Sequence, residues 1–283
     1  MSTVTPTTTF ANTTDTTFRA WAQAVHDALA SFGWVQTADT GQINLATATK
    51  PATTLTYSGF EIWRANDSLQ GTYPVFLKIE YGSGSNNASY PGLRITGATG
   101  TDGAGGLTGR VGAALYCHAG VSTVTTTAQK WSGGDERFVI VINVGGSPSP
   151  ILFCERITDT SGNPMGGGFC YGTVGATLDG FQLIQHDVAS VPSSVASVLP
   201  VVVTGATNWA VGGDIYFTPV FPVGYGVFNP LRQILLYGSG DLTELVDITL
   251  SHYGTSHTWT PYGSRVVAHL STNTNLRFLA RYD

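Results

Sequence analysis

The pattern of apolar and polar positions changes near residue 34. Before it, apolar side chains recur at helical spacing and share an arc of about 120°. Seven residues lie in this arc: Phe18, Trp21, Ala22, Val25, Ala28, Leu29 and Phe32. Four polar residues face away from it: Arg19, Gln23, His26 and Asp27. The spacing predicts one amphipathic helix that begins at Asp15 or a neighbouring Thr and ends at Gly33.

Beyond residue 34 the period becomes two, and turn residues recur about every ten positions. This pattern predicts strands at residues 59–64, 75–81, 137–144, 151–157, 169–174, 181–185, 214–220, 233–237, 245–251 and 264–271. The third and fourth of these are expected to form a hairpin, because prolines and glycines fill the segment between them. The expected fold class is mainly β, a β-sandwich or jelly-roll-like body with one N-terminal amphipathic helix and an extended N-terminal arm.

Two irregular segments divide the chain. Nine of the first 17 residues are Thr, so this segment has too little apolar mass to fold alone and is expected to be an arm ordered only by contact. Residues 186–200 contain small residues and two prolines, which predicts a connection. Three parts follow from this division: an arm and helix at 1–34, a β-sandwich body at 35–185 and a C-terminal β portion at 186–283.

The apolar stripe of the helix has two interpretations. In the first, the helix lies on its own sheet, as the burial of any such stripe requires. In the second, the arm and helix dock onto a neighbouring subunit. The second interpretation nominates five partner-contact residues: Phe10, Phe18, Trp21, Val25 and Leu29. Polar substitution of Trp21 and Val25 would then weaken assembly and leave the β body folded.

Charged side chains are sparse in this chain. Its 283 residues include 13 Lys and Arg and 18 Asp and Glu, about half the charged fraction of an ordinary soluble domain. Thr, Ser, Gly and aromatic residues take their place, which favours sheet and turns. A subunit whose surface is covered by its neighbours can dispense with such charges, so the composition suits a component of a large protein shell.

The net charge and the apolar runs limit the partners. The formal net charge is −5 with only three lysines, so there is no basic field for binding nucleic acid. No apolar run has the length of a membrane-spanning helix, and the first 12 residues lack the features of a signal peptide. We therefore expect no nucleic-acid partner, no membrane insertion, and synthesis in the cytoplasm.

Few residues suggest catalysis. Glycoside cleavage needs two carboxylates about 5 to 10 Å apart, and the best candidates are Glu61 and Glu80, with Asp67 nearby. Sheet carboxylates more often pair with basic residues across strands, here Arg64 and Lys78. The Gly-x-Ser-x-Gly elbow of serine hydrolases is absent from the sequence. The chain is therefore not expected to be an enzyme.

Metal, cofactor and sugar sites are not expected either. Cys117, Cys154 and Cys170 are widely spaced, which predicts buried thiols. The Cys117–His118 pair and the two histidines His252 and His257 supply too few metal ligands. The glycine-rich residues 97–106 precede no helix pattern, so they predict a loop at a sheet edge and not a phosphate site. The tryptophans alternate with polar residues, which favours the core over a sugar platform.

Four segments carry a resemblance. They are GFEIWRANDSLQGTYPVFLKIEYGSG at 59–84, PGLRITG at 91–97, TDGAGGLTG at 101–109 and FCERITDTSG at 153–162. In this order they resemble virion structural proteins of tailed bacteriophages, an uncharacterised group associated with the tail, neck or baseplate. The resemblance spans residues 10–165 and implies a place in the particle, with no functional residues carried over.

These observations together favour a non-enzymatic structural subunit of a bacteriophage particle. We expect it in the tail or its attachment apparatus, in several copies, with itself and other virion proteins as partners. One alternative is a receptor- or glycan-binding module of a tail fibre or spike, which would bind a host-surface glycan through the portion beyond residue 200. Further alternatives are a capsid decoration protein and a polysaccharide depolymerase.

Overall fold

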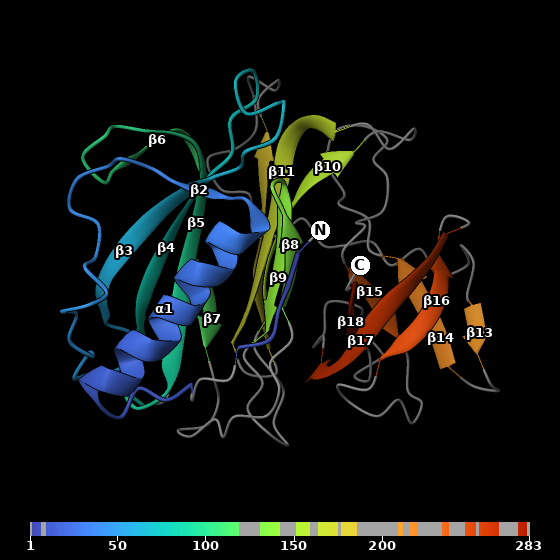
Figure 1. Cartoon of the computed structure of the whole chain (residues 1–283), viewed down its shortest axis with the longest axis horizontal. Helices are drawn as coiled ribbons and strands as arrows, with labels where there is room; N and C mark the ends of the chain where they lie inside the picture. The colour runs from blue at the N-terminus through green and yellow to red at the C-terminus, as the bar shows by residue number, and fades with distance from the viewer. Residues whose placement is uncertain are drawn as a thin grey trace.

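The structure is a computed structural model of the chain (Figure 1). It describes residues 2–6, 10–85, 87–118, 131–141, 151–158, 164–174, 177–185, 209–211, 215–219, 234–237, 247–252, 255–265 and 277–281. The described part is mainly β, with one N-terminal helix and antiparallel sheets. This confirms the expected class at the level of its secondary structure.

The helix α1 spans Asp15–Phe32. Thr14 is its N-cap, because the Thr14 hydroxyl accepts a hydrogen bond of 3.1 Å from the Thr17 amide. Gly33 ends it in the left-handed conformation at φ 97°, where its amide bonds the carbonyls of the last turn. The buried residues of α1 are the seven predicted from the apolar arc, so that prediction is confirmed.

The first sheet, sheet 1, contains twelve strands. Their bounds are β1 Ser2–Val4, β2 Val35–Gln36, β3 Tyr57–Arg64, β4 Phe76–Ser83, β5 Pro91–Thr101, β6 Leu107–Val111, β7 Leu115–His118, β8 Trp131–Gly134, β9 Arg137–Val141, β10 Ile151–Thr158, β11 Pro164–Val174 and β12 Thr177–Gln185. The order across the sheet is β1-β8-β9-β10-β11-β7-β5-β4-β3-β2, with β12 paired to β11 and β6 to β5. Its pairs are antiparallel except β11 with β7.

The second sheet, sheet 2, contains six antiparallel strands. They are β13 Trp209–Val211, β14 Ile215–Pro219, β15 Ile234–Tyr237, β16 Ile248–His252, β17 Thr255–Arg265 and β18 Arg277–Arg281. Their order is β13-β14-β15-β18-β17-β16. The chain therefore leaves sheet 1 at Gln185 and enters sheet 2 at Trp209; the connection predicted at 186–200 lies outside the described residues. The three-part division stays a prediction.

The core of the described residues lies between α1 and one face of sheet 1 (Figure 1). The helix contacts β1, β2, β8 and β9. The largest side chains of this core are aromatic and fully buried: Phe10, Phe18, Trp21, Trp63, Tyr81, Trp131 and Phe138. Trp63 and Trp131 thus belong to the core, as predicted. Trp21 packs against the Tyr81 ring of β4 at 5.9 Å between ring centroids, so the helix is in direct contact with this strand.

The strand predictions hold best where the alternation is regular. The β9–β10 hairpin is confirmed by antiparallel pairing from Ile151–Val141 to Glu155–Arg137, and its turn lies outside the described residues. The glycine-rich segment 97–106 was predicted as a loop, but residues up to Thr101 belong to β5. The last predicted strand, 264–271, is wrong at its start, because β17 spans Thr255–Arg265; residues 266–271 lie outside the described residues.

Candidate functional site

The carboxylate of Glu61 on β3 is the centre of a buried group of polar side chains. Alternation along the strand points Glu61 and Trp63 toward α1. Glu61 is in register with Ile79 of β4, so Tyr81 is its diagonal neighbour on the same face. The Glu61 side chain is only 2% exposed, and burial of this kind requires hydrogen-bond partners for both oxygens.

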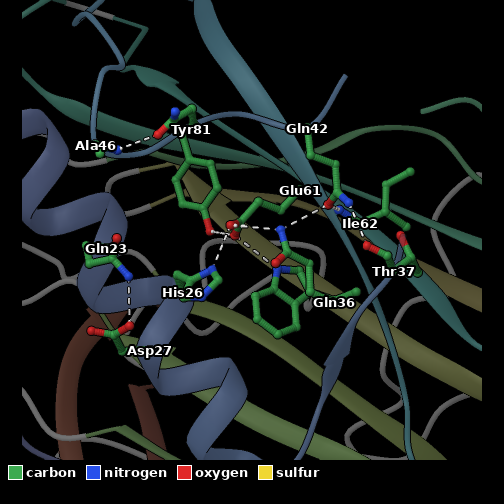
Figure 2. Close-up of polar contacts among 12 residues, drawn as sticks. Gln23, His26, Asp27, Gln36, Thr37, Gln42, Ala46, Glu61, Ile62 and Tyr81 are labelled. Atoms are coloured by element: carbon green, nitrogen blue, oxygen red, sulfur yellow. Dashed lines mark hydrogen bonds and ion pairs between the residues drawn. The ribbon is translucent and has the colours of Figure 1, made fainter. Parts of the chain in front are cut away.

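Four side chains supply those partners, and Figure 2 shows how three of them, His26, Gln36 and Tyr81, converge on Glu61. Oε1 lies 2.7 Å from His26 Nδ1 of α1 and accepts a 3.2 Å bond from Gln36 Nε2 of β2. Oε2 accepts bonds from the Tyr81 hydroxyl at 2.6 Å and from Trp63 Nε1 at 3.1 Å. We call these five residues the Glu61 cluster. One carboxylate therefore joins α1, β2, β3 and β4.

A second layer of amides holds Gln36 in place. Gln42 Oε1 accepts from Gln36 Nε2 at 3.2 Å and from the Ile62 amide at 2.8 Å. Gln42 Nε2 in turn donates to the main-chain oxygens of Thr37 at 2.7 Å and Asp39 at 3.1 Å. Figure 2 shows this relay beside the carboxylate. The loop after β2 is thereby tied to the middle of β3.

The electrostatics of the cluster favour a fixed structural role. Burial, together with the charge of Glu61 and the hydrogen bond to it, raises the pKa of Tyr81 well above its ordinary value of 10. Tyr81 therefore stays protonated and donates at neutral pH. Because both oxygens of Glu61 already have two partners each and the side chain is closed to solvent, the group has no free position for a substrate. The cluster fastens the helix to the sheet.

Sequence reasoning missed His26 in this cluster. His26 was predicted to face away from the core, but its ring packs edge-on against Trp63 at 5.1 Å and its side chain is 26% exposed. His26 lies at the border of the apolar arc, where its ring can turn toward the core or toward solvent. The available signal was Glu61 itself, because a carboxylate on the inward face of a strand requires a donor from the layer packed on it.

The two candidate glycosidase carboxylates lie on opposite faces of sheet 1. Glu80 is paired with Phe60 while Glu61 is paired with Ile79, so alternation sends the two side chains apart. They cannot flank one glycosidic bond. The expected partners were also wrong: Glu80 forms a two-bond ion pair with Arg94 of β5, and Glu61 bonds the cluster described above.

Lys78 and the glycine-rich turn form a third contact region. Lys78 Nζ donates to the Gly105 carbonyl at 2.7 Å and lies 3.8 Å from the centre of the Phe60 ring. Asp39 accepts bonds from the Thr101 hydroxyl and, at 3.2 Å, from the Gly105 amide. Burial alone would raise the pKa of Asp39, but hydrogen bonds from side chains and amides of this region bring it below its ordinary value. These contacts fasten the turn after β5.

Asp67 marks a second buried ion pair, on a different part of sheet 1. Arg156 of β10 is 1% exposed and binds both oxygens of Asp67, with Nη2 to Oδ1 at 2.8 Å. Arg156 Nη1 also donates to the main-chain oxygen of Tyr73 at 3.0 Å. The pair holds the segment between β3 and β4 against β10. The carboxylate of Asp67 is therefore paired with Arg156 and is not part of the Glu61 cluster.

Possible metal ligands do not gather in the described part of the chain. No group of three or more His, Cys, Asp or Glu side chains there is placed to hold a metal ion. Cys117 and Cys154 are buried, and strand alternation points Cys117 and its neighbour His118 to opposite faces. The side chains of Cys170 and His252 lie outside the described residues. On the β16–β17 hairpin, His257 is paired with Leu250 and not with His252.

All five predicted partner-contact residues lie in the core of the chain itself. Phe10, Phe18, Trp21, Val25 and Leu29 are each 0% exposed. This placement favours the first interpretation of the helix, in which the stripe packs on its own sheet. The five side chains have no exposed surface in this conformation. Docking onto a partner through them stays a prediction. Polar substitution of Trp21 or Val25 would damage the core, contrary to the expectation that the β body stays folded.

Comparison of the chain with protein-family models, with curated proteins and with solved structures finds no match. Among the described residues, no helix has the length and hydropathy required to cross a membrane.

Proposed function

We propose that the chain is a non-enzymatic structural subunit of a bacteriophage particle, located in the tail or its attachment apparatus and present in several copies. Its partners are then copies of itself and other virion proteins, and it is made in the host cytoplasm before assembly. The proposal rests on the neutral character of the surface, supported by the resemblance to virion structural proteins.

The observation that carries the proposal is that several of the few charges are used inside the fold. Glu61 is buried in its cluster, Asp67 and Arg156 form a buried pair, and Glu80 is largely covered by Arg94. The charged fraction of the sequence is only 11%. Covering a neutral hydroxyl costs much less free energy than covering a charge, so such a surface is well suited to close packing with neighbours.

The same surface offers little apolar area in its described part. Leu55 and Val111 are the large apolar side chains that are clearly exposed there, at 50% and 43%. Contacts made by this part would therefore be polar and nearly uncharged, built from Thr, Ser and Gly. The carboxylate of the Glu61 cluster has all its hydrogen-bond partners within the same chain, which supports an architectural role over catalysis.

We also propose that the strands form a sandwich or jelly-roll-like body. The two antiparallel sheets and the helix-covered face of sheet 1 support this arrangement. An experimentally determined structure of the assembled protein tests it, because a sandwich requires two sheets packed face to face over a common core.

The experiment that tests the function is to locate the chain in purified virus particles. We expect mass spectrometry of the particles to detect several copies, and images of particles carrying a labelled chain to place them at the tail. A chain found only dispersed in infected lysate, and missing from intact particles, would contradict the proposal. Turnover of host polysaccharide by the purified chain would favour the depolymerase, and retention on a glycan array the receptor-binding alternative.

A further inference from the structure

The N-terminal strand β1 completes one edge of sheet 1. It pairs antiparallel with β8 through three register positions, Ser2 with Gly133, Thr3 with Ser132 and Val4 with Trp131. Ser2 and Thr3 are exposed, and only Val4 is partly buried against the core. The strand is thus held by a short ladder and one apolar side chain, and it occupies the edge that β8 would otherwise present to solvent.

The two residues that flank the connection after β1, Val4 and Phe10, both lie beside Trp131. Val4 is paired with Trp131, and the Phe10 ring lies edge-on against the Trp131 ring at 5.5 Å between centroids. Trp131 is itself fixed, because its Nε1 donates to the Val141 carbonyl at 2.7 Å. Phe10 is fully buried, so the connection after β1 ends at a fixed residue.

The first two residues after β1 favour extended backbone. Pro6 fixes its own φ and biases Thr5 toward extended backbone. The first charged residue after Met1 is Asp15, so the arm lacks the charges that commonly prevent a strand from pairing with another chain. A short connection between a detachable element and a fixed anchor is the arrangement that permits exchange of that element between copies.

We propose that β1 is exchanged between neighbouring copies, so that residues 2–4 of one copy pair with the β8 edge of a second copy. The partner is a second copy of this chain, because the exchange reproduces the register and contacts that the single chain already makes. The inference rests on the proposed multi-copy assembly. Six residue steps from Phe10 to Val4 span roughly 20 Å when extended, so the β8 of the second copy must lie within that reach.

The test uses two variants of the full chain, Thr3→Cys and Ser132→Cys, each adding one cysteine to the three of the sequence; the variants are mixed during assembly and then oxidised. Positions 3 and 132 are directly paired, so their Cα atoms have the separation that a disulfide requires. Because each variant carries one new cysteine, a disulfide between them can form only between copies. We expect a covalent dimer on a non-reducing gel that disappears on reduction.

The matched control is Thr3→Cys mixed with Thr54→Cys. Thr54 is exposed but has no register partner in β1, so it is expected to give no dimer above the level of the unsubstituted chain. The double variant Thr3→Cys/Ser132→Cys tests for pairing of β1 with β8 within one chain. If the mixed variants give no dimer while the double variant closes within one chain, β1 stays on its own sheet and the proposal is wrong.

A deletion of residues 2–6 gives a second measurement that does not depend on Ser132, whose hydroxyl also donates to the Arg281 carbonyl at 2.5 Å. We expect the deletion to lower the fraction of associated chains in sedimentation at least several-fold, and unchanged association would overturn the exchange. Particle incorporation of the unsubstituted chain is measured separately. Incorporation without the mixed dimer refutes the exchange alone, whereas the mixed dimer without incorporation refutes the proposed function alone.

Discussion

The Tyr81 hydroxyl donates a 2.6 Å hydrogen bond to Glu61 Oε2 between two neighbouring strands of sheet 1. The two residues are diagonal neighbours on the face covered by α1. Because Tyr81 also packs against Trp21 of the helix, the bond couples the position of the buried carboxylate to the packing of the helix. Among the contacts of the Glu61 cluster, we therefore expect removal of this hydrogen bond to have the clearest effect on the free energy of unfolding.

Replacement of Tyr81 by Phe is expected to lower the free energy of unfolding by about 1.5 to 3 kcal/mol, the range for hydrogen bonds to charged groups. The ring stays in place, so the loss reports on the missing hydroxyl. Urea unfolding followed by fluorescence measures it. Tyr90→Phe is the matched control, because the Tyr90 side chain is half-buried and its hydroxyl bonds no other described residue. Equal losses for both variants would contradict the assigned role.

The raised pKa of Tyr81 predicts a dependence of stability on alkaline pH. The folded value lies above the unfolded value near 10, so the unfolded chain loses this proton first as the pH rises. The stabilising contribution is complete below about pH 10 and declines above it. Between about pH 9 and about pH 11, the unsubstituted chain should lose more free energy of unfolding than Tyr81→Phe. Parallel curves for the two proteins would argue against the shift.

The sequence predicted the helix and the regular strands because their signals are local. The arc from Phe18 to Phe32 and the αL position of Gly33 need no knowledge of the rest of the chain. The central strand β5 was missed, because its end was included in the loop predicted at 97–106 and no strand was predicted at 91–96. In the structure Gly92 packs under the His118 ring, where an added Cβ would come within 2.7 Å of that ring. Tertiary packing there requires a residue with poor strand propensity.

The candidate site was less predictable, because its donors come from four separate elements. His26 and Glu61 are 35 positions apart in the sequence, and nothing local to either residue specifies the other. The pairing of Glu80 with Arg94, in place of the expected basic residues Arg64 and Lys78, follows from the presence of the unpredicted β5 beside β4. A missed strand therefore led directly to a wrong ion-pair partner.

The buried pair of Asp67 and Arg156 predicts a strong asymmetry between single and double variants. Replacing Arg156 by Met leaves a buried carboxylate without its partner and is expected to lower the free energy of unfolding by about 3 to 5 kcal/mol. The double variant Asp67→Asn/Arg156→Met removes both charges. It should be less destabilised than the sum of the two single variants in urea unfolding. Additive losses would show that the two residues act independently.

The end of α1 predicts a backbone effect at Gly33. Replacing Gly33 by Ala forces a residue with a Cβ into a φ of 97°, which costs roughly 1 to 2 kcal/mol. The added Cβ would also lie 3.4 Å from Asp135 Cβ. The control is Gly71→Ala, because open space surrounds that position and its φ is not positive. Thermal unfolding should show a lower Tm for Gly33→Ala only; equal Tm values would contradict the left-handed cap.

His118 predicts a loss of stability in acid. Burial lowers its pKa from 6.5 to about 4, and the Tyr57 hydroxyl lies 3.1 Å from its Nε2 while its buried Nδ1 has no hydrogen-bond partner among the described residues. As the pH falls below about 6.5, the unfolded chain takes up this proton first, so the free energy of unfolding declines progressively down to about pH 4. His118→Phe keeps a ring without the titration. Between about pH 7 and about pH 4, the unsubstituted chain should lose up to about 3 kcal/mol more than this variant in urea unfolding, and identical acid profiles would show that His118 does not stay neutral in the fold.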